Sequence, residues 1–341
     1  MNWRRRGANV KQNVGKWVEM MPVEDFLESI AYQKLKRMLY ETVGLDCSCY
    51  RDEYLRRRLA VRLRATGTNN YSRYVRYLKK TPAEYDLVLN SLTINYTTFF
   101  RDRDVYVYLE KTVLPRLFKS DEVRIWSAGC ATGEEPYSLA ILIHKLLGKE
   151  LSKPKVTIFA SDLDEDALAK AVKGEYDKKQ LKGVEPWLVA KYFSKNGAAY
   201  RVKDFVRPLV RFEKHDLMQS SLHRDLDMVL CRNVMIFFAR ESQQQIHMYF
   251  YNALREGGYL VIGKSEILSG EPARKFLCTD VTCRVYQKSE ADSGCRGRGG
   301  LGVARKDTLS LNTSAEGQWI VAHTGETVPS MKEQGEWLLA S

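Results

Sequence analysis

The residues best suited to chemistry in this sequence are four acidic side chains that follow two predicted strands. Glu134 and Glu135 end a loop of small residues, SAGCATG, which follows a short β-branched and aromatic run. Pro136 then opens an apolar segment with helical spacing, and a second apolar run beyond it ends at Asp162 and Asp164. A strand, loop, helix and strand of this kind bring loop amides, a helix N-terminus and carboxylates to one edge of a parallel sheet, where ligands bind.

The composition of this loop indicates which ligand it fits. Gly129 and Gly133 lack the third glycine of a dinucleotide fingerprint, and two glutamates beside them would repel a diphosphate. They suit a ligand that carries ribose hydroxyls and a positive centre, and S-adenosylmethionine has both. The same residues also have a plainer interpretation, because glycines allow close helix packing and acids favour the positive end of a helix dipole.

Length and composition indicate a soluble globular protein with about two domains. The chain has 341 residues, of which 44% are hydrophobic and 28% charged. No run approaches the ~18 apolar residues that span a bilayer, and the N-terminal stretch lacks the apolar core of a signal peptide, so we expect a cytoplasmic protein without membrane insertion. The seven cysteines form no CxxC pair and no zinc spacing with histidine, which argues against metal and structural disulfides.

The formal net charge of +12 calls for an acidic partner, which nucleic acid or an acidic protein surface would provide. Much of this charge lies on the helix predicted over 50–65, where arginines repel one another unless a partner neutralises them. A solvated face whose arginine stems cover apolar surface is the plainer interpretation. The candidate docking residues are Arg56, Arg57, Arg58, Arg62 and Arg64.

Periodicity and composition divide the chain into five segments. The expected segments are a basic extension (1–20), a helical docking domain (21–93), an interdomain junction (94–103), an α/β domain (104–288) and a disordered tail (289–341). A small antiparallel β insertion is expected at about 174–214, and its last strand ends near Asp216. Further strands are expected over 123–126, 156–160, 226–231, 259–262 and 282–287, with Gly257-Gly258 as the turn into 259–262. Polar or glycine residues follow the strand ends at 126, 160, 216 and 231, which predicts a ligand site at one sheet edge.

Four blocks occur in order along the chain: NYTTFFR, SAGCATGEEPYSLAI, ASDLDEDAL and CRNVMIFF. In content and spacing they resemble the CheR-type chemotaxis receptor methyltransferases, over about residues 25–288. The resemblance implies an α/β fold with a small N-terminal helical domain and a Rossmann-like methyltransferase domain that carries a small antiparallel β subdomain. It also implies transfer of a methyl group from S-adenosylmethionine to receptor glutamates, giving glutamyl methyl esters and S-adenosylhomocysteine for sensory adaptation.

The resemblance also implies site residues, block by block. Asp162 would bind the ribose hydroxyls, and Arg101 and Thr97 would act in catalysis. Arg101 would hold the acceptor carboxylate or the methionine carboxylate through charge-assisted hydrogen bonds. Some members have a tyrosine where this chain has Phe237, close to the methyl donor. The implied cofactor contacts are Asn95, Thr97, Arg101, Ala128, Gly129, Glu135, Asp162, Asp216, Leu217, Arg232 and Asn233.

Little machinery is required, because a glutamate is already ionised near neutral pH and a sulfonium methyl is already electrophilic. Acidic helices of the receptor's cytoplasmic region would dock on the arginine helix, so charge reversal of Arg58 and Arg62 is expected to raise the KM for receptor. Because the turn SKNGAA between Phe193 and Tyr200 is short, we expect no strong binding of a receptor C-terminal peptide. We expect a monomer that associates with membrane receptor arrays.

Two other functions stay open on the sequence. A nucleic-acid methyltransferase would fit the charge, although the block at Arg232-Asn233 lacks the Asn/Asp-Pro-Pro-aromatic pattern used to hold a flipped base. A catalytically silent S-adenosylmethionine-binding scaffold would fit the phenylalanine at position 237. Detection of base-labile methyl ester on receptor fragments would separate all three.

Overall fold

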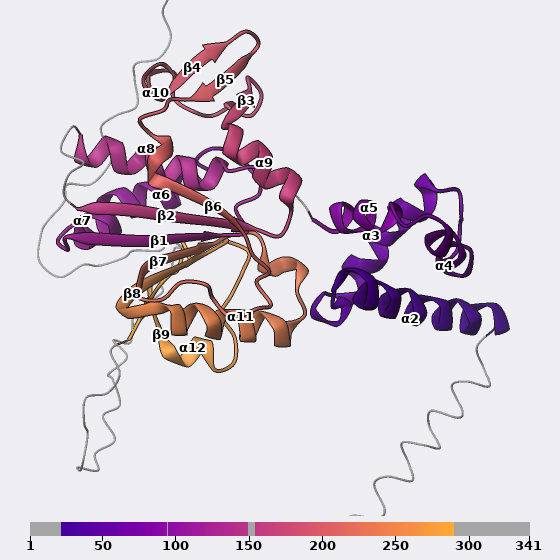
Figure 1. Ribbon diagram of the computed structural model, residues 1–341. Helices are drawn as coiled ribbons and strands as arrows, with labels where there is room; N and C mark the ends of the chain where they lie inside the picture. Colours follow the sequence, from indigo (N-terminus) through magenta and orange to yellow (C-terminus); the bar gives the residue numbers. More distant parts are fainter. Residues whose placement is uncertain (1–21, 94, 149–153, 290–341) are drawn as a thin grey trace, which may run out of the picture. The chain divides into compact units, whose positions relative to one another are not determined.

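The computed structural model describes residues 22–93, 95–148 and 154–289, which form a helical domain and an α/β domain (Figure 1). The predicted basic extension (1–20) and all of the predicted tail beyond Ser289 lie outside the described residues. Among the described helices, none is long and apolar enough to cross a membrane.

The helical domain packs its helices around one apolar core of leucine and tyrosine side chains, among them the fully buried Tyr32, Leu35 and Tyr74. The first helix ends at Gly44, whose φ of +71° is the left-handed conformation that suits glycine at a helix C-terminus. The elements of the helical domain are α2 (Val23–Val43), the 3₁₀ turn η1 (Cys47–Cys49), α3 (Asp52–Ala65), α4 (Tyr71–Lys80) and α5 (Glu84–Leu92). A helical domain was predicted over 21–93, and the helix predicted over 50–65 is α3.

The α/β domain is built on a seven-stranded sheet with the order β6-β2-β1-β7-β8-β10-β9. Neighbours from β6 to β8 pair in parallel, whereas β10 pairs antiparallel with both β8 and β9. The strands are β1 (Glu122–Ala128), β2 (Lys155–Asp162), β6 (Val210–Lys214), β7 (Leu226–Cys231), β8 (Leu254–Ile262), β9 (Phe276–Asp280) and β10 (Val285–Lys288).

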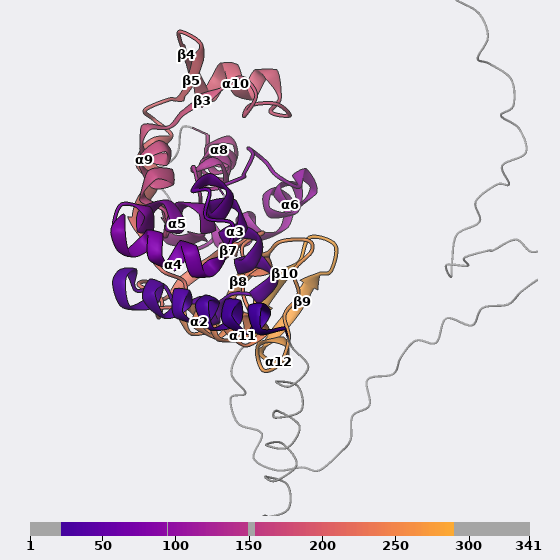
Figure 2. The ribbon, with the colours of Figure 1, turned by 90° about the vertical axis from the view of Figure 1, so that its right-hand side faces the viewer.

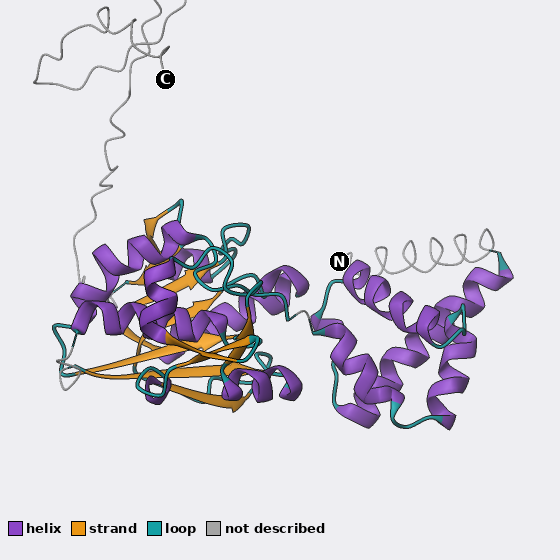
Figure 3. Ribbon diagram, turned by 90° about the horizontal axis from the view of Figure 1, so that it is seen from above, coloured by secondary structure: helices purple, strands orange, loops and turns teal. Residues whose placement is uncertain are grey.

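Helices cover both faces of this sheet, above and below the strands in Figure 1, and Figure 3 looks from above onto the helices of one face. Because neighbouring residues of a strand point to opposite faces, Ile125 of β1 packs in the cluster that contains Leu139 of α8, and Trp126 packs in the cluster that contains Phe250 of α11. The flanking helices are α8 (Glu134–Leu147), α9 (Glu165–Lys173), α11 (Arg240–Ala253) and the short α12 (Pro272–Lys275). This mostly parallel sheet with helices on both faces is the predicted α/β architecture.

A helical segment that precedes the sheet was not predicted. It consists of α6 (Arg103–Tyr108), a π-helical turn (Leu109–Val113) and α7 (Leu114–Leu117). Val105, Leu109, Val113 and Leu117 are all buried, so their spacing of four residues was a usable signal.

The small antiparallel insertion contains three strands: β3 (Glu175–Asp177), β4 (Phe193–Asn196) and β5 (Ala199–Val202). They lie together with α10 (Pro186–Tyr192) in Figure 2. The strand expected to complete this insertion was wrongly placed. Residues 210–214 pair in parallel with β2, so they form the edge of the main sheet, reached through the 3₁₀ turn η3 (Arg207–Leu209).

Two further expectations are corrected near the end of the domain. Gly257-Gly258 does not precede a strand but lies within β8, where the pairing with β7 shifts register between Leu226 and Met228. The last strand begins at Val285 rather than at residue 282, because residues 281–284 form the turn from β9, a strand that was not predicted.

Candidate cofactor site

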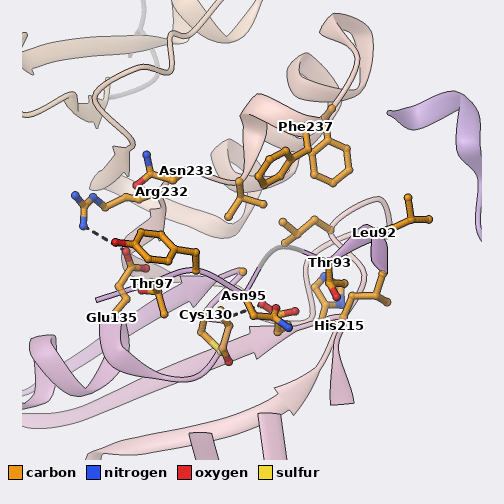
Figure 4. A pocket seen from close by; sticks show the side chains of 18 of the residues that line it. Leu92, Thr93, Asn95, Thr97, Cys130, Glu135, His215, Arg232, Asn233 and Phe237 are labelled. Carbon is orange, nitrogen blue, oxygen red and sulfur yellow. Dashed lines mark hydrogen bonds and ion pairs between the residues drawn. The ribbon is translucent and has the colours of Figure 1, made fainter. Parts of the chain in front are cut away.

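A cleft of about 940 Å³, part of it open to solvent, lies at the carboxyl ends of the parallel strands (Figure 4). Segments after β1, β2, β6 and β7 contribute to its walls, together with the junction that follows α5. All of the expected cofactor-binding residues line it except Ala128. Ala128 is fully buried in the cluster that contains Trp126, because its side chain points to the same sheet face as that of Trp126.

The loop after β1 reaches the cleft in a conformation that only glycine adopts easily. Gly129 has a φ of +77°, and its amide and that of Cys130 donate to the carbonyl of Ser161 at 2.8 and 2.9 Å. A Cβ on Gly129 would meet Cγ2 of Val234 at 2.6 Å. The loop therefore contacts the segment after β7 closely, and this contact shapes the floor of the cleft.

This close contact makes Gly129→Ala informative. We expect the alanine variant to bind S-adenosylhomocysteine at least about tenfold more weakly, because the left-handed backbone alone costs roughly 1–2 kcal/mol and the methyl group displaces Val234. Adding Val234→Ala removes the contact and should restore part of the affinity in calorimetric titration. Gly44→Ala is the control, since Gly44 has a similar φ and open space around it. Equal affinities of Gly129→Ala and the wild type would contradict the role given to this loop.

Asp162, at the end of β2, presents a half-buried carboxylate to the cleft. Its Oδ2 accepts from the amide of Ala131 at 2.8 Å, and its Oδ1 accepts from the amide of Asp164 at 3.0 Å. Burial raises the pKa of Asp162, against the lowering effect of these two hydrogen bonds. A carboxylate has about four lone-pair sites, so two protein donors leave it able to accept from a ribose diol.

Arg232 occupies the centre of a buried charge cluster. Its guanidinium donates to the carbonyl of Arg101 at 2.9 Å and to Oδ2 of Asp102 at 2.7 Å. It also lies 3.5 Å from Oε2 of Glu135, whose other oxygen accepts from Ser127 at 2.8 Å. Burial raises the pKa of Glu135, and the positive charge of Arg232 opposes that rise. The two terminal nitrogens of Arg232 are thus engaged by the protein, whereas its Nε has no partner among the described residues. Both Arg232 and Glu135 line the cleft.

Asn233 presents an unpaired acceptor to the cleft wall. It adopts a φ of +62°, and its buried Oδ1 has no hydrogen-bond partner among the described residues. The conformation is held from below, because the buried carboxylate of Glu266 accepts from the amides of Asn233 and Met235 at 3.1 and 2.8 Å. An unpaired acceptor beside Asp162 and Glu135 fits a ligand with hydroxyl, amino and cationic groups, which are those of S-adenosylmethionine.

The junction brings the remaining expected residues to the cleft. Asn95, Thr97 and Arg101 all line it. The guanidinium of Arg101 lies 5.8 Å from the ring centroid of Tyr96 and donates to the carbonyl of Tyr96 at 3.3 Å. Within the described part of the chain it forms no ion pair, so most of its donors are available to a ligand.

Several aromatic residues of the cleft escaped sequence reasoning. Tyr50 and Phe238 stack with ring centroids 4.9 Å apart, and Phe237 packs against Tyr54 at 4.8 Å. Tyr50, Phe237 and Phe238 line the cleft, as does His215, whose pKa is lowered by burial. Phe237 had been placed near the methyl donor only by family resemblance. Tyr50 carried no signal, because it pairs with residues almost two hundred positions away.

The arginine helix, α3, is less available than its sequence indicated. Arg62 forms two hydrogen bonds of 2.9 Å with the buried Glu84, and Arg58 donates to the carbonyl of Ser91. Charge reversal at these positions would break contacts inside the domain, so neither is a sound test of docking. Arg56 is exposed but pairs with Asp52 at 2.6 Å, and Arg57 and Arg64 are exposed.

In the described ranges, no group of three or more histidine, cysteine or acidic side chains is arranged to hold a metal ion. The six cysteines of those ranges are free thiols, and all but Cys278 are buried.

Comparisons with known proteins agree with this architecture. Residues 30–93 match the family model described as "CheR methyltransferase, all-alpha domain", and residues 95–285 match "CheR methyltransferase, SAM binding domain". A chemotaxis protein methyltransferase of Listeria innocua is 34% identical over 237 residues, covering 69% of this chain and 89% of that protein. The chemotaxis protein methyltransferase of Salmonella typhimurium is 32% identical over 273 residues (78% and 93%), and that of Escherichia coli is 32% identical over 270 residues (77% and 92%). Both the helical domain and the cleft-bearing α/β domain fall within these matches, and the chain belongs to the CheR family of S-adenosylmethionine-dependent methyltransferases.

Proposed function

We propose that this protein transfers the methyl group of S-adenosylmethionine to glutamate carboxylates of chemotaxis receptors. The observation that supports the proposal is that Asp162, Glu135, Asn233 and Arg101 line one cleft. Among the described residues, Oδ1 of Asn233 has no hydrogen-bond partner and Arg101 forms no ion pair. Of the four residues, the first three suit the cofactor, and Arg101 suits a carboxylate. The names of the relatives, which are chemotaxis protein methyltransferases, support the substrate class.

The chain's own residues have three tasks in this reaction. S-adenosylmethionine supplies a methyl group that is already activated by its sulfonium centre. Arg101 holds the acceptor carboxylate or the carboxylate of the cofactor, because the other arginine of the cleft, Arg232, is engaged by Asp102. Tyr50, Phe237 and Phe238 form an apolar wall that limits water near the reacting groups. Alignment of the acceptor carboxylate with the methyl group and exclusion of water then accelerate the transfer. No general base is required, since the acceptor is ionised at neutral pH.

The assay that tests this function uses labelled S-adenosylmethionine and receptor cytoplasmic fragments. We expect label in the receptor that mild base releases as methanol, with S-adenosylhomocysteine as the second product. Label that appears in DNA or RNA, together with a steep salt dependence of the protein's binding to that nucleic acid, would favour a nucleic-acid methyltransferase. Cofactor binding without transfer to any acceptor would favour the silent scaffold.

We propose that the acidic receptor helices dock on the part of α3 that carries Arg57 and Arg64, with Arg56 beside them. The double reversal Arg57→Glu/Arg64→Glu should raise the KM for receptor roughly 3- to 10-fold at low ionic strength, and less at high salt, because exposed charges act mainly by steering. Its affinity for S-adenosylhomocysteine should not change. Lys178→Glu/Lys182→Glu, which alters the same charge at exposed sites of the α/β domain, is the matched control. An unaltered KM in the arginine variant would sink the docking proposal.

We further propose that the protein acts as a monomer at membrane receptor arrays. The weak or absent binding of a receptor C-terminal peptide to the β insertion also stays a prediction. Calorimetric titration of such a peptide checks it, and micromolar binding would contradict it.

A further inference from the structure

Asp164 belongs to none of the cofactor-binding residues above and does not line the cleft, yet its carboxylate joins two of the cleft's walls. It is almost fully buried at the start of α9. Its Oδ1 accepts from the amide of Ala167 at 3.0 Å, which is an ordinary helix N-cap. Its Oδ2 accepts from the hydroxyl of Thr93 and from the side-chain amide of Asn95, both at 2.7 Å.

A continuous set of hydrogen bonds runs from the junction through Asp164 to the loop after β1. The amide of Asp164 donates to Oδ1 of Asp162 at 3.0 Å, and Oδ2 of Asp162 accepts from the amide of Ala131 at 2.8 Å. Thr93 and Asn95 are thereby linked to the carboxylate expected to bind ribose. Thr97 and Arg101 follow Asn95 closely in the chain, so whatever fixes Asn95 restricts where they can lie.

An N-cap alone does not account for this arrangement. Capping uses one oxygen, and a serine or asparagine would provide it. The second oxygen accepts both junction donors, so it has a separate task. Burial alone would raise the pKa of Asp164, but the hydrogen bonds from Thr93, Asn95 and the amides of α9 outweigh it and lower the pKa, which keeps the carboxylate ionised and its hydrogen bonds strong.

We propose that Asp164 is a positioning residue for the methyl-transfer site, whose Oδ2 holds Thr93 and Asn95 so that Thr97 and Arg101 face the bound cofactor. The inference rests on the proposed function, because it assigns the cleft to S-adenosylmethionine. It also changes the expected role of Asn95: the side-chain nitrogen of this residue serves the protein rather than the ligand.

The experiment measures S-adenosylhomocysteine binding by calorimetry, with thermal unfolding as a check on folding, in variants that leave the N-cap intact. Thr93→Val removes one donor at constant shape, and we expect a roughly tenfold rise in Kd, as is typical for a lost hydrogen bond to a charged group. Thr93→Ser keeps the hydroxyl and should stay within about twofold of the wild type.

The decisive variants exchange the donor and acceptor. Asn95→Asp places two carboxylates in contact and should weaken binding by roughly tenfold or more. In Asn95→Asp/Asp164→Asn, residue 164 becomes the donor and residue 95 the acceptor of this hydrogen bond. The double variant should therefore recover most of the affinity for S-adenosylhomocysteine. Were Asn95 only a direct cofactor contact, the second change would bring no recovery. Wild-type affinity in Thr93→Val and Asn95→Asp, or no recovery in the double variant, would overturn the inference alone; a wild-type protein that does not bind S-adenosylhomocysteine would overturn the proposed function as well.

Discussion

Asp162→Ala is expected to weaken S-adenosylhomocysteine binding by at least about 100-fold. If its carboxylate binds the ribose diol, two charge-assisted hydrogen bonds are lost, and each contributes roughly 1.5–3 kcal/mol. Such losses correspond to roughly 10²- to 10⁴-fold in Kd. The amides of Ala131 and Asp164 also lose their acceptor, so the loop after β1 is expected to shift as well.

Calorimetric titration of S-adenosylhomocysteine measures the effect, and thermal unfolding reports whether the variant is folded. Glu165→Ala is the matched control, because Glu165 is an exposed acid three residues away that pairs only with Lys214 among the described residues. The control should bind like the wild type. An Asp162→Ala protein that is folded and binds within about threefold of the wild type would remove Asp162 from the cofactor site and, with it, the ribose end of the proposed cleft.

Arg232→Met is expected to lower the free energy of unfolding by about 3–5 kcal/mol at neutral pH, the usual result of removing one partner of a buried ion pair. Methionine fills much of the volume, but Glu135 and Asp102 lose their positive partner. Because burial raises the pKa of Glu135 and Arg232 opposes that rise, the pKa should climb further in the variant.

The pH dependence of this loss has a definite sign. A folded pKa above the unfolded value means that the native state of the variant binds the extra proton, so its stability falls as the pH rises through the folded pKa. The deficit relative to the wild type should therefore be smaller at pH 5 than at pH 7.5. Adding Glu135→Gln should recover part of the loss and flatten this dependence. Urea unfolding at both pH values measures it, and a pH-independent deficit that Glu135→Gln leaves unchanged would show that the buried pair does not set the stability here.

Local patterns in the sequence were sufficient for most of the fold. The helices of the N-terminal domain and the strands at 122–128, 155–162 and 226–231 follow from local signals. These signals are helical periodicity, glycines that end helices, and short apolar runs. The pairing of 210–214 could not be read this way, because a short edge strand has the same composition in a hairpin as beside β2. Parallel or antiparallel pairing is decided by partners more than forty residues away.

The site divides along the same line. The end of a predicted strand identified Asp162, since ligands bind at the carboxyl edge of a parallel sheet, and the acidic end of the loop after β1 identified Glu135. The sheet face to which the Ala128 side chain points depended on the exact residues of the strand. The pairing of Arg62 with Glu84 depended on how α3 packs against α5. Asp164 was visible as a strand-end acid, but the donors that define its proposed task, Thr93 and Asn95, lie 71 and 69 residues earlier in the chain.

The stacking of Tyr50 on Phe238 has a bearing on how this protein can be divided. The boundary between the two matched regions, near residue 94, passes through the wall of the cleft, because Tyr50, Leu92 and Thr93 lie on the N-terminal side of it. The backbone amide of Arg51 also donates to the carbonyl of Phe237 at 3.0 Å. A fragment cut at that boundary would retain the sheet and its acidic strand ends but would lose the part of the cleft wall that Tyr50, Leu92 and Thr93 form. The helical domain therefore supplies part of the proposed cofactor site itself.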